Sequence, residues 1–293
     1  MQLVDYSQVV IAAFFANKVM IDTPDQDLMR HIILNTLRSY NLKYRTKYGQ
    51  MVICADGNNT WRKQIFPYYK GNRAKNRDES GIDWSLIFET LNMVYAELVD
   101  HSPFLCVRQD GAEADDVIAV LAKHSFKNSE PSLIISSDKD FKQLQRYDGI
   151  SQYSPALNNY KGGFIVEESP NDFLVEHTIK GDPGDGIPNI FSDDDVFMNQ
   201  DKRQAPATSN RVKQMTDYLW SSSSKTIPQQ WRDNYTRNKE LIDLDQIPSE
   251  ITHKIMGQFL VAKSQTNKAD FLEYLIAKKC KLLIKDINDF YNM

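Results

Sequence analysis

The chain lacks the features that would assign it to the membrane or the secretory pathway. It contains no apolar run near the roughly 18 residues that a membrane-spanning helix requires. It also has no basic segment followed by an apolar one at its start. We therefore expect neither a membrane span nor a signal peptide.

Cysteine and histidine are also scarce. The 293 residues include three Cys and five His, and there is no CxxC motif. Cys54 and Cys106 lie within apolar strand candidates, which suits buried, reduced thiols in a cytoplasmic protein. A zinc centre or a catalytic thiol therefore has little support in this sequence.

An excess of positive charge is missing as well. The formal net charge is −4, so a uniformly basic coat for nucleic acid is excluded and any such contact must use local patches. With 41% hydrophobic residues, the chain is long enough for one large core or two smaller ones.

Carboxylates, by contrast, are concentrated at particular places. In the stretch VRQDGAEADDVIAVL, an apolar helical run follows directly after Glu113, Asp115 and Asp116. The first turn of a helix favours anions, because unpaired N–H groups and the helix dipole face them. This explains one or two acids, but not the acids that occur elsewhere.

Further acids follow other strand-like or turn segments. LVD ends at Asp5, VICAD at Asp56 and LIISSDKD at Asp138 and Asp140, while the turn-rich KGDPGD holds Asp182 and Asp185. A parallel sheet collects the ends of its strands at one edge, and ligands of open α/β sheets bind at that carboxyl edge. We therefore expect most of these acids to lie together.

Such a cluster has an electrostatic cost. Each like-charged pair near 4 Å costs on the order of 4 kcal/mol at an effective dielectric constant of about 20. Hard divalent cations with oxygen ligands, Mg²⁺ or Mn²⁺, offset that cost, and two such ions about 4 Å apart hydrolyse phosphodiesters. The alternative is a set of solvated acids at strand ends, which is the usual role of a single Asp.

Residues 57–77 have the opposite character. The segment contains six basic residues and no acid, interleaved with Trp61, Phe66, Tyr68 and Tyr69. Its basic residues are Arg62, Lys63, Lys70, Arg73, Lys75 and Arg77. Cations that meet phosphates and rings that stack on bases form a single-strand contact surface. The alternative is a solvated basic loop whose aromatic rings pack on the core.

Alternating strands and helices predict an α/β fold with a central, mostly parallel sheet flanked by helices. The expected strands are 2–5, 51–55, 104–107, 133–137 and 150–153, the last at an edge. The expected helices are 8–16, 27–48 and 85–98. Beyond about residue 179 the pattern becomes helical and polar. We expect a core over residues 1–179 and a helical region over residues 180–293, for which the family resemblance given below implies DNA binding.

Several of these motifs together resemble the 5′-nuclease or flap endonuclease superfamily. AEADD, ISSDKDF, YYKGNR and GDPGD carry the resemblance, and LVDYSQ, DGNNTWRKQIFPYYKGNR and YTRNKELIDLDQIP extend it through nearly the whole chain. Within the superfamily, the ribonucleases H of T-even bacteriophages are the group that the chain resembles most.

The resemblance implies a PIN-like nuclease core with a helical arch at about residues 57–100. It also implies two Mg²⁺ or Mn²⁺ ions. The first would be held by Asp5, Asp56, Glu113, Asp115, Asp116 and Asp138. The second would be held by Asp140, Asp182 and Asp185. Lys70 and Arg73 would reach the scissile phosphate, and other nucleic-acid contacts would come from Arg62, Lys63, Tyr69, Lys75 and Arg77.

The activity that this resemblance implies is structure-specific 5′-3′ exonuclease and flap endonuclease action on DNA and RNA–DNA hybrids. The implied task is removal of RNA primers during lagging-strand replication by a monomer, in the host cytoplasm if the chain is encoded by a phage. Partners would be branched or 5′-flap DNA, and replication proteins such as a single-stranded DNA-binding protein or a sliding clamp. The alternatives are a PIN-like ribonuclease, a non-catalytic DNA junction-binding protein and, with less support, a phosphatase that uses the DKD of SSDKDF.

Overall fold

The computed structural model describes residues 1–18, 25–199, 201–220, 227–262 and 267–291, without the side chains of residues 74–76. The chain divides into two compact units that alternate along the sequence. Unit 1 comprises residues 1–58, 82–166 and 249–293, and unit 2 comprises residues 59–81 and 167–248.

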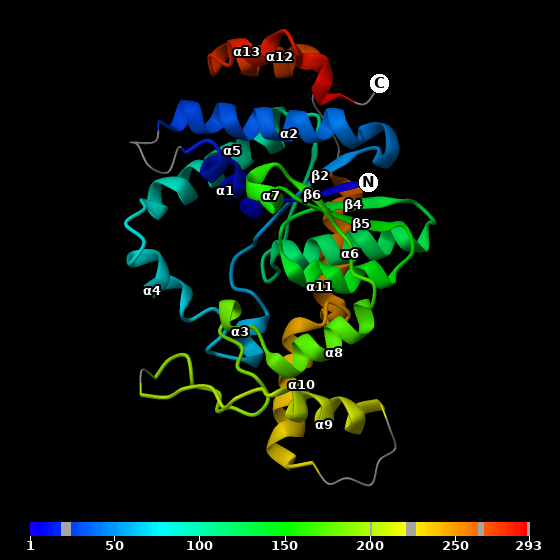
Figure 1. Cartoon of the computed structure of the whole chain (residues 1–293). Coiled ribbons are helices and arrows are strands. Elements are labelled where there is room, and N and C mark those ends of the chain that lie inside the picture. The colour runs from blue at the N-terminus through cyan, green and yellow to red at the C-terminus, as the bar shows by residue number, and fades with distance from the viewer. Residues whose placement is uncertain (19–24, 200, 221–226, 263–266, 292–293) are drawn as a thin grey trace. The chain divides into compact units, whose positions relative to one another are not determined.

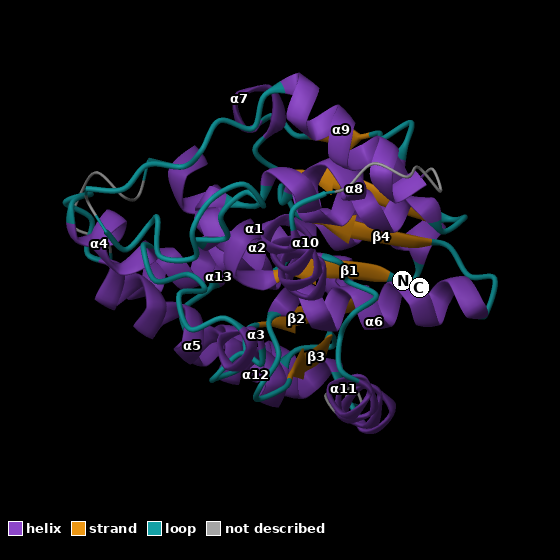
Figure 2. Ribbon diagram, turned by 90° about the horizontal axis from the view of Figure 1, so that it is seen from below, coloured by secondary structure: helices purple, strands orange, loops and turns teal. Residues whose placement is uncertain are grey.

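Unit 1 is built on a six-stranded sheet with the order β3-β2-β1-β4-β5-β6. Figure 2 shows four of these strands, β4, β1, β2 and β3, side by side. The strands are β1 (Gln2–Asp5), β2 (Met51–Ala55), β3 (Leu105–Arg108), β4 (Ser132–Ile135), β5 (Ile150–Ser154) and β6 (Gly163–Ile165). All neighbours pair in parallel except β5 and β6, which are antiparallel. The expected mostly parallel sheet is therefore confirmed.

The expectation that residues 150–153 form an edge strand is wrong. β6 pairs on the outer side of β5, with Tyr153 opposite Phe164 and Ser154 opposite Gly163. This strand was not expected because it has only three residues and begins with a glycine, which weakens a strand signal. The short antiparallel strand therefore forms the edge of an otherwise parallel sheet.

Helices cover both faces of the sheet in unit 1 (Figure 1). One face packs against α1 (Tyr6–Ala16), α2 (Gln26–Tyr48) and α5 (Trp84–His101), with α12 (Lys268–Ala277) contacting α5. The other face packs against α6 (Ala114–Lys127), on which α11 (Ser249–Val261) lies. Because side chains alternate along a strand, Val4, Ile53 and Ile135 enter the core of the first face together. Short elements complete the unit: η1 (Lys139–Arg146), α7 (Leu157–Tyr160), α13 (Lys281–Ile284) and η3 (Ile287–Phe290).

Unit 2 is helical, and its described residues form two small cores. Its elements are α3 (Arg62–Ile65), α4 (Arg73–Asp78), α8 (Pro170–Lys180), η2 (Pro183–Asp185), α9 (Ser209–Trp220) and α10 (Gln229–Ile242). One core joins Phe66 and Tyr69 to Leu174 and Ile187, and a second joins Ile179 and Ile190 to Met215. The basic segment is therefore tied to the polypeptide that follows residue 167 by buried apolar contacts.

The units differ from the single division expected after residue 179. α11, α12 and α13 belong to unit 1, because α11 packs on α6 and β3 and because Phe271 and Leu275 of α12 enter the sheet core. Of the arch expected at residues 57–100, α5 also belongs to unit 1. As a statement about parts that fold on their own, the division at residue 179 stays a prediction. Within the described ranges, every helix is too short or too polar to cross a bilayer.

Candidate active site

The strand-end acids of unit 1 meet at one edge of the sheet. Asp5 is the last residue of β1, Asp56 follows β2, and Asp138 follows β4 after two serines. Since β1 pairs in parallel and in register with both β2 and β4, these three ends come to the same edge. The gathering of acids expected there is present.

Asp5 is the most shielded of these three acids, with 6% of its surface exposed. It caps α1 by accepting a hydrogen bond from the Gln8 N–H at 3.3 Å, and its other oxygen accepts one from the Ser136 hydroxyl at 2.8 Å. The pKa of Asp5 is raised from 3.8 to about 7, mainly by burial and further by the neighbouring Asp56 and Asp138, while the hydrogen bonds oppose the rise. Asp5 therefore lies in an environment that is short of positive charge.

Asp56 connects the end of β2 to the start of α6. One of its oxygens accepts a hydrogen bond from the Ala114 N–H at 3.0 Å, and the other accepts one from the Ser7 hydroxyl at 3.2 Å. A carboxylate is stabilised there, because the first N–H groups of a helix have no partner within the helix. The side chain is exposed, so its remaining lone pairs are accessible to a ligand.

The AEADD acids divide into structural and accessible positions. Glu113 caps α6 and Asp116 accepts a hydrogen bond from the Glu113 N–H at 2.9 Å, which together form a capping box. Asp116 is completely buried, whereas Asp115 between them is half-buried. The helix-start explanation thus accounts for part of this motif, and the rest of its carboxylate oxygens remain candidates for metal.

Asp138 and Asp140 begin the 3₁₀ helix that follows β4. Asp138 accepts a hydrogen bond from the Asp140 N–H at 2.9 Å, and its own N–H donates to the Ser136 hydroxyl at 3.1 Å. Ser136 thus contacts both Asp5 and Asp138, a linking role that the sequence motifs did not indicate. The sequence signal for this role was a polar residue that follows an apolar strand and precedes an acid by two positions.

The donor chemistry of this edge fits a hard divalent cation. Its side-chain ligands are carboxylate oxygens supplied by several chain segments, the donor type that Mg²⁺ and Mn²⁺ prefer. The raised pKa of Asp5 gives the same indication, because a bound cation would reverse the repulsion from Asp56 and Asp138. The carboxylates of Asp5, Asp56, Glu113, Asp115, Asp116 and Asp138 all belong to unit 1.

The set expected for a second ion is divided between the units. Asp140 belongs to unit 1, and Asp182 and Asp185 belong to unit 2. Within unit 2, Asp182 caps η2 by accepting a hydrogen bond from the Gly184 N–H at 2.9 Å. Its other oxygen lies 3.6 Å from His177 Nε2. Asp182 is thus shielded and engaged by its own turn.

Asp185 lies against the predicted phosphate-contact residues. Its carboxylate pairs with Lys70 Nζ at 3.6 Å and with Arg73, and it accepts a hydrogen bond from the Tyr69 hydroxyl at 2.9 Å. Burial alone would raise the pKa of Asp185, but Lys70, Arg73 and Tyr69 together hold that pKa below 3.8. The structure therefore brings Lys70 and Arg73 together around one carboxylate.

Two of the predicted nucleic-acid contacts are corrected by their burial. Arg62 is 3% exposed and donates from Nε to the Leu241 carbonyl at 2.8 Å, so it joins α3 to α10. Tyr69 is 2% exposed and cannot offer its ring to a base. Lys63 is exposed and Arg77 is half-buried, while the side chain of Lys75 lies outside the described residues.

The aromatic residues of the basic segment mostly serve the core of unit 2. Trp61 and Phe66 are buried, and only Tyr68 of the four rings is exposed. The alternative in which these rings pack on the core is therefore correct for three of them. Sequence composition could not separate the two roles, because Tyr and Trp suit both a core and a stacking surface.

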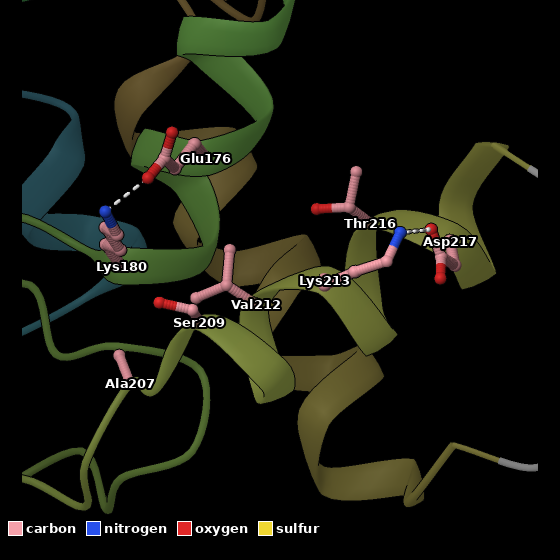
Figure 3. Close-up of a pocket in the computed structure, with 8 residues that line it drawn as sticks. All are labelled: Glu176, Lys180, Ala207, Ser209, Val212, Lys213, Thr216 and Asp217. Carbon is pink, nitrogen blue, oxygen red and sulfur yellow. Dashed lines mark hydrogen bonds and ion pairs between the residues drawn. The ribbon is translucent and has the colours of Figure 1, made fainter.

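Unit 2 also contains a pocket of about 360 Å³ between α8 and α9 (Figure 3). Its walls carry two internal ion pairs, Glu176 with Lys180 and Lys213 with Asp217. Ser209, Val212 and Thr216 of α9 also line it. Its charges are paired within each helix, and it includes none of the predicted site residues. It is therefore separate from the candidate site.

Comparisons with known proteins agree with this arrangement. Residues 1–168 match the family described as 5′-3′ exonuclease, N-terminal resolvase-like domain, and residues 169–290 match the C-terminal domain of T4 RNase H. Ribonuclease H of Enterobacteria phage T4 is 29% identical over 292 residues, which cover 98% of this chain and 95% of that protein.

Two solved structures share the fold. The T5 5′-exonuclease with bound divalent zinc has a TM-score of 0.63 at 18% identity, covering 89% of this chain and 98% of that one. The bacteriophage T5 flap endonuclease in a complex with DNA and metal ions has a TM-score of 0.62 at 16% identity, covering 88% and 97%. At these identities the likeness establishes the architecture of the chain.

Proposed function

This chain belongs to the 5′-3′ exonuclease family, and from that membership we propose how its residues hydrolyse a phosphodiester at a 5′ end or flap. The enzyme is a structure-specific 5′-3′ exonuclease and flap endonuclease. The observation that carries the proposal is the acidic edge of unit 1, where burial, together with the neighbouring Asp56 and Asp138, raises the pKa of Asp5 to about 7.

The carboxylates of that edge would hold divalent metal, which supplies hydroxide and stabilises negative charge on phosphorus when bound. We assign a first Mg²⁺ or Mn²⁺ to Asp5, Asp56, Glu113, Asp115, Asp116 and Asp138, in part through water. A second ion at Asp140, Asp182 and Asp185 stays a prediction, because these residues are divided between the two units and Asp185 already pairs with Lys70 and Arg73. The hydrogen bonds from Ser136 and Ser7 orient Asp5 and Asp56 and leave other lone pairs for the cation.

Lys70 and Arg73 would contact the scissile phosphate. Arg suits bidentate contact with phosphate oxygens, whereas Lys acts as a compact point charge. Charges that are already in place when the phosphate becomes more negative lower the barrier without reorganisation. The exposed Lys63, with Lys75 and Arg77, would bind the nucleic-acid backbone and contribute affinity more than rate.

The substrates that we propose are 5′-flap or branched DNA and RNA–DNA hybrids. The biological task would be removal of RNA primers during lagging-strand replication, by a monomer in the host cytoplasm. Three free cysteines, two of them buried, are compatible with that reducing compartment. A single-stranded DNA-binding protein or a sliding clamp would deliver the enzyme to its junction.

A comparison of two substrates tests this proposal. A 5′-flap DNA and a blunt RNA–DNA hybrid are digested side by side, with magnesium and with excess EDTA. We expect both to be cut from the 5′ end only when magnesium is present. Binding without cleavage would instead identify a junction-binding protein, and cleavage of single-stranded RNA alone would identify a PIN-like ribonuclease.

A further inference from the structure

The basic segment and the GDPGD turn of unit 2 are joined at several points. The Lys70 N–H donates to the Asp185 carbonyl at 2.7 Å, and Asn72 Nδ2 donates to the Pro183 carbonyl at 2.9 Å. A Cβ added to Gly186 would lie 3.1 Å from the Tyr68 carbonyl oxygen, so the two backbones are in close approach. The segments are therefore docked by main-chain contacts as well as by charge.

One carboxylate serves two cations at this junction. The Asp185 side chain is 15% exposed and interacts with Lys70 and Arg73, whose side chains are 16% and 44% exposed. When a shielded carboxylate pairs with two cations, the protein itself offsets the cost of burying its negative charge. Its charge therefore has a function in unit 2 that requires no bound metal.

The Tyr69 hydroxyl fixes the orientation of this carboxylate. The Tyr69 ring packs with Phe66, Leu174 and Ile187 in one core of unit 2, and its hydroxyl donates to Asp185 Oδ2 at 2.9 Å. A ring held by a core has little rotamer freedom, so the hydrogen-bond donor is also fixed. Lys70, the next residue, has the left-handed φ of +57°, a conformation that surrounding contacts must maintain.

We propose that Asp185 is a positioning residue that holds Lys70 and Arg73 together as a prepared phosphate-binding pair, with Tyr69 as its anchor. This inference rests on the proposed role of both cations in phosphodiester cleavage. Both cations pair with the same Asp185 carboxylate, so the long, flexible Lys and Arg side chains lose freedom before substrate arrives. Loss of the anchor would let both cations disperse, which lowers rate more than affinity.

Hydrogen exchange of the metal-free full-length protein tests the docking directly. Tyr69→Phe keeps the buried ring and removes the hydroxyl, and Asp185→Asn keeps the size and removes the charge. Both should accelerate amide exchange in peptides that cover residues 68–73. Tyr68→Phe, a change to the exposed neighbouring ring, is the matched control and should exchange like wild type.

Single-turnover cleavage across a magnesium titration is the second measurement. Tyr69→Phe should lower the rate at saturating magnesium on the order of tenfold, the effect of one hydrogen bond to a charged group, and should leave the magnesium midpoint unchanged. The proposal is overturned if Tyr69→Phe exchanges and cleaves like wild type while Asp185→Asn shifts only the magnesium midpoint. Because the exchange measurement needs neither substrate nor metal, it decides the docking even if the wild type shows no nuclease activity.

Discussion

Asp5 in unit 1 and Asp185 in unit 2 are both largely shielded from solvent, but their neighbours have opposite charges. Asp5 has Asp56 and Asp138 nearby, and its pKa is raised to about 7. Asp185 has Lys70 and Arg73, and its pKa is lowered. Burial acts on both in the same direction, so the difference comes from the neighbours. The edge around Asp5 thus requires added cations, whereas the charge of Asp185 is balanced by its own unit.

The strongest test of this contrast removes a carboxylate from the edge that requires cations. Asp138→Asn should abolish cleavage, with a loss of at least about 10³-fold, because a neutral amide is a poor ligand for Mg²⁺. Asn can still accept the hydrogen bond from the Asp140 N–H, so the fold should persist. Single-turnover cleavage and circular dichroism measure the two effects.

Asp148→Asn is the matched control for that experiment. Asp148 is an exposed acid two residues before β5, at the amino end of that strand, and the change should leave cleavage at the wild-type rate. Efficient hydrolysis by Asp138→Asn, or by wild type in excess EDTA, would contradict the assignment of metal to this edge.

The second test measures the cost of crowding the carboxylates. Between the ordinary pKa of 3.8 and the folded value of about 7, the folded state holds a proton on Asp5 that the unfolded chain has released. The contribution of Asp5 to stability therefore falls as the pH rises through this window. Asp5→Asn should stabilise the metal-free protein at pH 8, by about 4 kcal/mol at most, and should have little effect at pH 4.

Urea unfolding in EDTA at pH 4 and pH 8 measures this difference. Asn is itself a good helix cap, so the bond to the Gln8 N–H should be retained. A variant that is less stable than wild type at pH 8 would show that the hydrogen bonds of the charged Asp5 outweigh the repulsion.

The sheet and the acidic edge were predictable because they depend on short, local signals. The apolar runs at residues 51–55 and 104–107 end where β2 and β3 end to within one residue, and parallel pairing then places Asp5 and Asp56 at the same edge. β6 was not predictable, since three residues that include glycine carry no strand periodicity. The interleaving of the units also depends on contacts between segments that are distant in sequence.

The basic segment shows why side-chain roles were harder to predict. Arg62 and Lys63 are adjacent and equally charged, yet Arg62 is buried against α10 and Lys63 is exposed. The GDPGD motif grouped Asp185 with the metal ligands, which stays a prediction, and it gave no sign of the ion pair with Lys70. Its pairing with Lys70 depends on how residues 59–81 dock, and no local pattern encodes that contact.

The third test addresses the cations on the Asp185 side of the comparison. Lys70→Ala or Arg73→Ala should lower the single-turnover rate about 10²-fold, the usual effect of losing one positioned donor to a developing charge. Duplex affinity should change far less. Lys63→Ala serves as the comparison. Losing an exposed contact to the nucleic-acid backbone should weaken binding and reduce its salt dependence, with little change in the cleavage rate. If Lys70→Ala and Lys63→Ala behave alike, Lys70 is only a backbone contact.

The smallest expected effect is that of Asp185→Asn on stability, and its sign is opposite to that of Asp5→Asn. Because the folded-state pKa of Asp185 lies below 3.8, its charge stabilises the folded protein above that pH, and this contribution is lost as the pH falls through the folded pKa. Asp185→Asn should therefore cost on the order of 1 kcal/mol at pH 7 and progressively less as the pH falls through the folded-state pKa. We measure the urea midpoints of wild type and variant in EDTA at pH 7 and at lower pH. Taking the difference between the two midpoints at each pH cancels the titration of all other acids. If Asp185→Asn instead stabilises the metal-free protein at pH 7, as Asp5→Asn should, then Lys70 and Arg73 do not neutralise Asp185 and it behaves like Asp5, as an acid that requires metal.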